Sequence, residues 1–181
     1  MNIYQALKKD HQKVSELLDK LVQSSESDGE KWKEWVDQIR DELIPHSRAE
    51  EAVFYNAIRE LSPSNDAIKH SYAEHAMAEA DLRALQAMKV IDVNWTRLAK
   101  KLRSDLLHHI ETEENSVFSS AQKLFTEEEA KMIGKAFNTL KSTVEEQSFV
   151  GTTLDLISNL LPRRLVPGFR KGLSKEQKRS A

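Results

Sequence analysis

The sequence contains no cysteine, and this absence removes several classes of functional site. Disulfide bridges, thiolate-held iron–sulfur clusters and zinc fingers all require cysteine. With no thiol, and with serines mostly in expected loops, the chain also shows no nucleophile arrangement suited to hydrolysis. The lack of cysteine fits a reducing compartment, so we expect a cytoplasmic protein.

Glycine and proline are scarce, with 5 and 4 residues respectively among 181, while helix-favouring residues are abundant. No apolar run approaches the roughly 20 residues that a membrane-spanning helix needs, and the N-terminus lacks the apolar core of a signal peptide. The formal net charge of −2 provides no general attraction for nucleic acid. We therefore expect an all-α protein with no transmembrane segment and no nucleic-acid partner. Composition leaves the oligomeric state open.

Apolar residues recur at steps of three and four through five segments, which predicts helices over about residues 2–23, 30–61, 66–90, 95–123 and 126–147. Short loops between the first four predict antiparallel neighbours, an up-down-up-down four-helix bundle over residues 1–125. A short fifth helix is expected within 126–148, opened by a capping box at Thr126. Pro45 lies inside the second segment, where it predicts a kink or a helix boundary.

Residues 149–181 form a C-terminal extension of two kinds of sequence. An apolar cluster, expected to dock on the bundle or on a second subunit, comprises Leu154, Leu156, Ile157, Leu160 and Leu161. A basic tail follows, with Arg163, Arg164, Arg170, Lys171, Lys175, Lys178 and Arg179. Such a charge run predicts a flexible solvated tail, with contact to a membrane surface or nucleic acid as the alternative.

One short pattern occurs twice, in the stretches Pro45–Glu51 and His109–Glu114. Both contain His-x-x-x-Glu-Glu followed closely by Val-Phe. On a helix, positions i and i+4 share a face, so each copy presents an imidazole and a carboxylate together. This face coincides with the apolar stripe expected in the core, where a carboxylate is costly unless it pairs or binds a cation. The pattern predicts metal ligands; the alternative is chance spacing on an exposed charged helix.

A third His-x-x-x-Glu, His75 with Glu79, falls on the third expected helix, and a lone His11 lies on the apolar face of the first. A lone histidine there is more often an ordinary core residue. However, counting residues from the loops places all of these groups at one height in an antiparallel bundle. The candidate ligands are therefore His11, His46, Glu50, His75, Glu79, His109 and Glu113. His70 and His108 point away from this layer and are weaker candidates.

Four imidazoles and up to three carboxylates exceed the four ligands that one zinc ion takes. They suit a two-metal centre whose carboxylates bridge the ions. Nitrogen and oxygen donors without sulfur favour iron or manganese, although copper or zinc can compete on affinity.

The ordered set, one histidine on the first helix and one His-x-x-x-Glu on each of the next three, resembles the hemerythrin-like, or HHE cation-binding, domain over about residues 1–125. The resemblance implies two non-haem iron ions (Fe2+/Fe3+), bridged by carboxylates and by an oxo or hydroxo group. It also implies a small-molecule partner: O2, NO or peroxide. By position, Glu50 and Glu113 would bridge the ions. His75 and His109 would be terminal ligands of one ion, and His11 and His46 of the other, which keeps an open coordination position.

The chain departs from the oxygen-carrying members at Glu79, where they have a further histidine. Invertebrate carriers also have an acid one residue later than Glu113, at the position of Glu114 here. If Glu79 binds the metal, its negative charge favours the ferric state. Reversible O2 carriage is then disfavoured relative to peroxide chemistry or tight iron binding.

Three functions compete at this stage. The first is a di-iron centre with peroxide-disproportionating, catalase-like or related redox activity, consistent with a role under oxidative stress. The second is a non-enzymatic O2, NO or iron sensor, or an iron store. The third is a purely structural bundle whose polar core network only sets helix register. The pattern favours metal binding and does not separate the first two functions.

Overall fold

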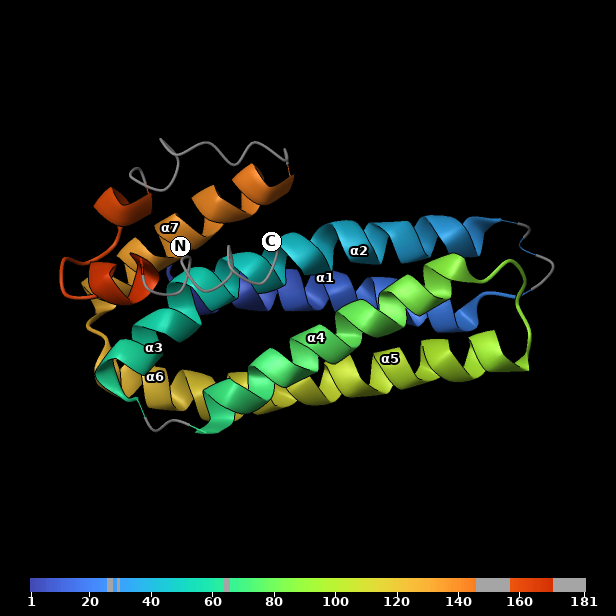
Figure 1. The fold of residues 1–181 in the computed structure, drawn as a ribbon, viewed down its shortest axis with the longest axis horizontal. Coiled ribbons are helices and arrows are strands. Elements are labelled where there is room, and N and C mark those ends of the chain that lie inside the picture. Colours follow the sequence, from blue (N-terminus) through green and yellow to red (C-terminus); the bar gives the residue numbers. More distant parts are fainter. Residues whose placement is uncertain (26–27, 29, 64–65, 146–156, 171–181) are drawn as a thin grey trace.

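The computed structural model describes residues 1–25, 28, 30–63, 66–145 and 157–170. Four long helices dominate it: α1 (Ile3–Gln23), α2 (Lys31–Glu50), α4 (Asp66–Ala87) and α5 (Val93–Thr112). They alternate in direction along one common axis (Figure 1). Around that axis α1 contacts α2, α2 contacts α4, α4 contacts α5, and α5 contacts α1. The expected all-α, up-down-up-down bundle is confirmed.

Two of the long helices widen into a π-helical turn. After α2 the chain continues as η2 (Glu51–Tyr55) and α3 (Asn56–Leu61), and after α5 as η3 (Glu113–Val117) and α6 (Phe118–Leu124). Pro45 lies inside α2, which ends only at Glu50. The helix boundary considered at Pro45 is therefore wrong, and the irregular turn comes later, beside the second carboxylate of the motif. Isolated π turns inside helices are frequent at functional sites.

The fifth helix, α7 (Glu127–Glu145), packs against both α1 and α2. Its capping box forms as expected, because the Glu129 amide donates to Thr126 Oγ1 at 3.2 Å and the Thr126 amide donates to Glu129 Oε2 at 2.9 Å. In Figure 1 this orange helix lies over the end of the bundle that holds the N-terminus. The helix thus covers the α1–α2 side of the bundle near that end.

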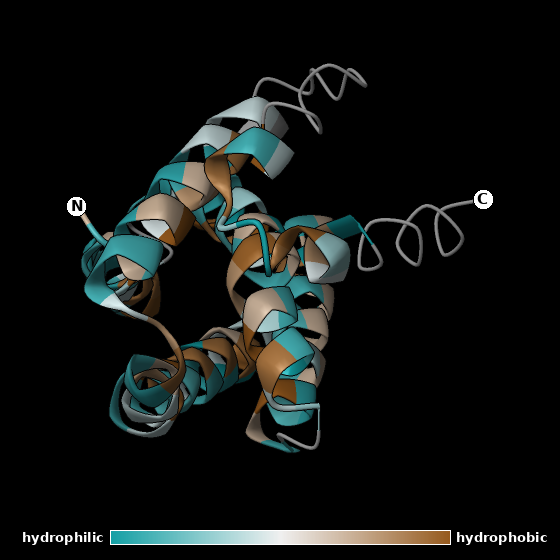
Figure 2. Cartoon of the chain, turned by 90° about the vertical axis from the view of Figure 1, so that its left-hand side faces the viewer, coloured by the Kyte–Doolittle hydropathy of each residue, from teal (hydrophilic) through white to brown (hydrophobic). Residues whose placement is uncertain are grey.

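The apolar core is split into two clusters. One contains Trp32, Trp95 and the leucines near the α1–α2 loop. The other contains Phe54, Phe118 and residues of α7. Brown, hydrophobic segments turn towards the interior in the end-on view of Figure 2. Between the two clusters lies a layer of buried polar side chains, described in the next subsection.

Part of the C-terminal extension folds back onto the bundle. Residues 157–160 and 166–170 are helical, and Ile157, Leu161, Leu165 and Phe169 are buried in the same cluster as Phe54. The expected contact with the bundle is therefore present, and residues 157–170 are packed against it rather than forming a free tail. Leu154, Leu156 and the basic residues from Lys171 onwards lie outside the described residues. Among the helices described, none has the length and apolar character needed to cross a bilayer.

Candidate metal centre

Six of the seven expected ligands meet in the polar layer. His11 comes from α1, His46 and Glu50 from α2, His75 from α4, His109 from α5, and Glu113 from the first residue of η3. All six are buried, and the two glutamates are completely inaccessible to solvent. Antiparallel helices of similar length therefore bring the groups to one height.

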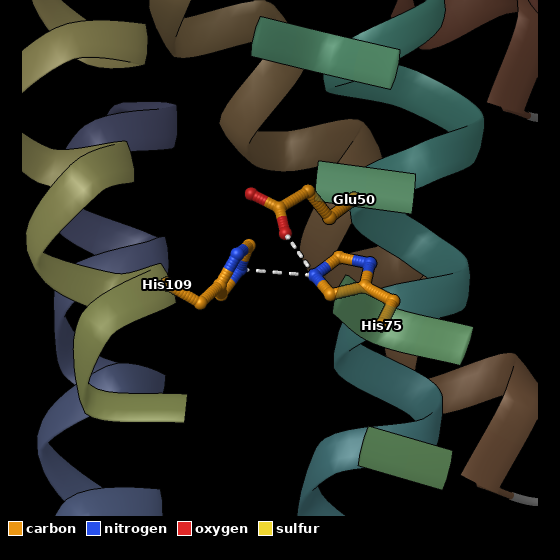
Figure 3. A group of neighbouring side chains, drawn as sticks. All are labelled: Glu50, His75 and His109. Atoms are coloured by element: carbon orange, nitrogen blue, oxygen red, sulfur yellow. Dashed lines mark hydrogen bonds and ion pairs between the residues drawn. The ribbon is translucent and has the colours of Figure 1, made fainter. Parts of the chain in front are cut away.

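Glu50, His75 and His109 form one part of the layer (Figure 3). His75 Nε2 lies 3.1 Å from His109 Nε2 and 3.5 Å from Glu50 Oε2. The three residues offer ligand atoms that all lie within 4.8 Å of one another. Two imidazole nitrogens and a carboxylate oxygen at this separation are suited to a common cation.

The other part of the layer contains His11, His46 and Glu113. The two imidazole rings have centroids 5.2 Å apart. His11 Nε2 is 3.2 Å from Glu113 Oε2, and His46 Nε2 is 3.4 Å from Glu50 Oε2. The Tyr55 hydroxyl donates to Glu113 Oε1 at 2.8 Å. Glu50 thus lies between the two histidine pairs, because the same oxygen is near both His46 and His75.

Each of the four histidines has its Nδ1 against a carboxylate on a neighbouring helix. The pairs are His11 with Glu114 (3.0 Å), His46 with Asp10 (3.2 Å), His75 with Glu51 (2.9 Å) and His109 with Glu74 (2.8 Å). We call these four acids the outer carboxylates. A carboxylate at Nδ1 fixes the ring orientation and leaves Nε2 free to bind a metal. All four Nε2 atoms face the inside of the layer, where each lies near a glutamate oxygen or another imidazole nitrogen.

The layer has more polar atoms than hydrogen bonds. In the described part of the chain, side-chain atoms that are buried without a hydrogen-bond partner include His11 Nε2, Glu113 Oε2 and both oxygens of Glu50. The 3.2 Å approach of His11 to Glu113 lacks hydrogen-bond geometry. Unpaired buried polar atoms are rare in folded proteins and require an explanation. A bound cation provides one, and this donor set fits iron or manganese.

The ionisation of the residues in the layer is also consistent with a bound cation. Burial raises the pKa of the Glu50 carboxyl well above its ordinary value, and the nearby Glu113 charge raises it further. Burial would also raise the pKa of Glu113, but contacts with His11 and Glu50 hold it below its ordinary value. Burial, followed by the neighbouring His109, lowers the pKa of His75 well below its ordinary value. A cation at the centre would favour the ionised carboxylates and neutral imidazoles that metals bind.

Glu79 is the expected ligand that the fold does not bring into the layer. Its Oε2 accepts from Arg48 Nη2 at 2.8 Å, and its Oε1 accepts from Arg83 Nη2 at 2.5 Å. Two guanidinium groups thus hold this carboxylate at the outer side of α4. The inference that Glu79 adds charge to the metal centre loses its structural basis. His70 and His108 are exposed, as expected.

Sequence reasoning did not predict that the outer carboxylates contact the histidines or that Tyr55 contacts Glu113. A usable signal existed, because each outer carboxylate is adjacent in sequence to an expected ligand: Asp10 to His11, Glu51 to Glu50, Glu74 to His75 and Glu114 to Glu113. A neighbour in sequence points about 100° round the helix, towards the next helix of the bundle. Tyr55 had no comparable signal, because its position depends on the π turn η2.

Known proteins resemble this chain along most of its length. The family described as hemerythrin HHE cation binding domain matches residues 2–121. A crystal structure of a hemerythrin HHE cation binding domain-containing protein from Mycobacterium kansasii superposes with a TM-score of 0.69 at 20% identity, covering 93% of this chain and 99% of that one. A protein named DNA nickase from a Nostoc strain is 26% identical over 147 residues, which are 81% of this chain but only 41% of that protein.

Proposed function

This chain belongs to the hemerythrin HHE cation-binding domain family, and from that premise we propose that it holds two iron ions and uses them to bind and react with O2, NO or peroxide. The observation that carries the proposal is the convergence of four Nε2 atoms and two glutamates in a buried layer. Several of their polar atoms have no hydrogen-bond partner among the described residues.

The contacts support a division of the ligands into two sets. His75 and His109 approach each other through Nε2 at 3.1 Å and would hold one ion. His11 and His46, with ring centroids 5.2 Å apart, would hold the other. Glu50 lies near a histidine of each set and would bridge. Glu113 would be the second bridge, with Tyr55 fixing one of its oxygens.

Bound iron would supply one-electron redox chemistry at this layer. The chain's own groups orient and shield it. The outer carboxylates direct each Nε2 inwards, and the two apolar clusters exclude bulk water from both sides. A cavity of about 270 Å3 between α2 and α4 has His75, Glu51 and Tyr72 among its lining residues, with Arg48 and Glu79 beside them. This cavity would admit a small molecule to the layer.

The nicking of DNA is named for the Nostoc relative, of which this chain covers 41%. The net charge of −2 gives no general attraction for a phosphate backbone. We therefore do not extend DNA cleavage to this chain.

Metal content tests the proposal directly. The protein purified from iron-replete cells should contain about two iron ions per chain, measured by elemental analysis together with the visible spectrum. Glu50→Ala should lower the content to below about one ion, because the bridging carboxylate is lost. Glu79→Ala is the matched control, since it also removes a glutamate one turn after a histidine. It should leave the content unchanged. A metal-free wild-type protein would contradict the proposal and favour the structural bundle.

Turnover separates the enzyme from a binding protein. Addition of peroxide to the iron-loaded protein should release O2, and His46→Ala should abolish this release because a ligand of the second ion is lost. A change of the visible spectrum with O2, NO or peroxide, but without turnover, would identify a non-enzymatic sensor or iron store.

A further inference from the structure

Helix α7 lies outside the part of the chain that the family matches, which ends at residue 121. Nevertheless it reaches the metal layer through two side chains. Phe137 is fully buried, and its ring packs edge-on against His46, with centroids 5.7 Å apart and an interplanar angle of 82°. The side chain of Lys141 is only 12% exposed, an unusual degree of burial for a lysine.

Lys141 continues a chain of contacts that ends at the layer. Its Nζ lies 2.9 Å from Asp10 Oδ2 and 3.2 Å from Glu42 Oε2. The same Asp10 oxygen lies 3.2 Å from His46 Nδ1. Because a carboxylate accepts hydrogen bonds, His46 donates through Nδ1–H and directs the lone pair of Nε2 towards Glu50. Lys141 and His46 thus share one oxygen atom.

Two other outer carboxylates also lie near a basic side chain, but these side chains are much more exposed than Lys141. Glu114 lies 3.2 Å from Lys8, whose side chain is 57% exposed. Glu74 lies 3.2 Å from His70, which is 66% exposed. An exposed charge is screened by solvent and held loosely, whereas a buried pair is screened much less. Asp10 is therefore the outer carboxylate that a buried lysine holds in place.

We propose that α7 is a positioning element of the metal centre, in which Lys141 fixes Asp10, and Asp10 together with Phe137 fixes His46. The inference rests on the proposed two-metal function. It predicts that the two ions depend unequally on α7. The ion held by His11 and His46 needs Lys141, whereas the ion held by His75 and His109 does not.

The test is a titration of metal-free protein with Co2+, whose visible absorption reports its ligands. We compare Lys141→Met with wild type. Wild type should bind about two ions, and Lys141→Met should bind one of them about 10–100-fold more weakly, the usual effect of losing an outer partner of a ligand. Lys141→Arg should restore the affinity, because it retains the positive charge. Lys13→Met is the matched control, since Lys13 also pairs with Glu42 but contacts His46 neither directly nor through Asp10 in the structure.

Asp10→Asn provides a second test in case Lys141→Met does not fold. It leaves α7 unchanged and removes the negative charge that Lys141 and His46 share. It should weaken the same ion, and Lys141→Met added to Asp10→Asn should weaken it no further. Additive losses, equal weakening of both ions, or unchanged binding in Lys141→Met or Asp10→Asn would overturn the inference. Failure of the wild-type protein itself to bind two ions would instead refute the proposed function.

Discussion

At Glu50 a carboxyl group lies fully buried between two histidines, and neither of its oxygens is hydrogen-bonded to any residue that the structure describes. Folding removes this group from water without replacing the hydrogen bonds it made there, which is destabilising. Glu79 also follows a histidine by one turn, but it has two arginine partners at the surface. The difference supports the proposal that Glu50 binds metal, because its burial does not stabilise the metal-free fold.

This leads to a prediction at the residue scale. Glu50→Leu should raise the unfolding free energy of the metal-free protein by about 1–3 kcal/mol, because an apolar side chain of similar size replaces an unpaired carboxyl group. The same variant should lose the extra stability that metal gives the wild type. Urea unfolding with a chelator, and again with iron, measures both effects. Glu79→Leu should show no such gain. A less stable Glu50→Leu protein in chelator would contradict the argument.

Among the elements, the segment around η2 is unusual because every residue from Ala49 to Ile58 is buried. A helix in a simple four-helix bundle exposes one face to solvent, whereas this one is buried all round. Contacts with α7 account for part of this cover. The buried polar residues Glu51 and Asn56 thus lie where a surface would otherwise be expected. The fifth helix therefore belongs to the same core as the bundle.

Close contact between α7 and the start of α1 depends on Gly134. A Cβ added there would lie 2.6 Å from Asn2 C and 2.7 Å from Ile3 N, both backbone atoms that cannot turn aside. Gly134→Ala should therefore lower the unfolding free energy by about 1–3 kcal/mol, because overpacking outweighs the roughly 1 kcal/mol gained in helix propensity. Urea unfolding measures the change. Lys135→Ala, at an exposed neighbour, should be close to neutral, and a stabilised Gly134→Ala protein would show that the helices separate easily.

On the scale of the whole molecule, the C-terminal segment joins the bundle through both apolar and charged contacts. Phe169 and Leu165 are buried in the main cluster. Arg164 makes a two-point ion pair with Glu129, with Nε–Oε1 2.6 Å and Nη2–Oε2 2.7 Å, and also donates to the Leu124 carbonyl at 3.0 Å. These contacts join the segment to the first turn of α7 and the end of α6.

The ion pair makes this docking sensitive to acid. The hydrogen bond from Arg164 lowers the pKa of Glu129 to about 2 from an ordinary 4.5. Since the folded-state pKa is the lower one, the pair stabilises the fold above about pH 4.5, and its contribution falls away as the pH drops towards 2. Arg164→Gln should cost up to about 1 kcal/mol at pH 7, the range for partly exposed pairs, and almost nothing near pH 2. Unfolding of wild type and variant across this range measures the difference, and a pH-independent difference would contradict it.

Much of the architecture follows from local pattern. The apolar steps of three and four predicted the helices within a few residues, and the capping box at Thr126 correctly marked the start of α7. Counting residues from the loops predicted one layer for seven residues, and the structure brings six of them together: His11, His46, Glu50, His75, His109 and Glu113. These features depend on helix geometry, which is the same wherever the helix lies.

The remaining features depend on contacts between segments that are distant in the chain. Glu79 and Glu50 each follow a histidine by four residues, but Glu79 lies outside the layer, where it pairs with Arg48 of another helix and with Arg83 of its own. The outer carboxylates, the π turns and the approach of Lys141 to Asp10 likewise arise when helices pack. Sequence spacing determines which face of a helix a residue occupies. The partner that this face meets is decided by packing, because the neighbouring helices compete for the same buried space and the same charges.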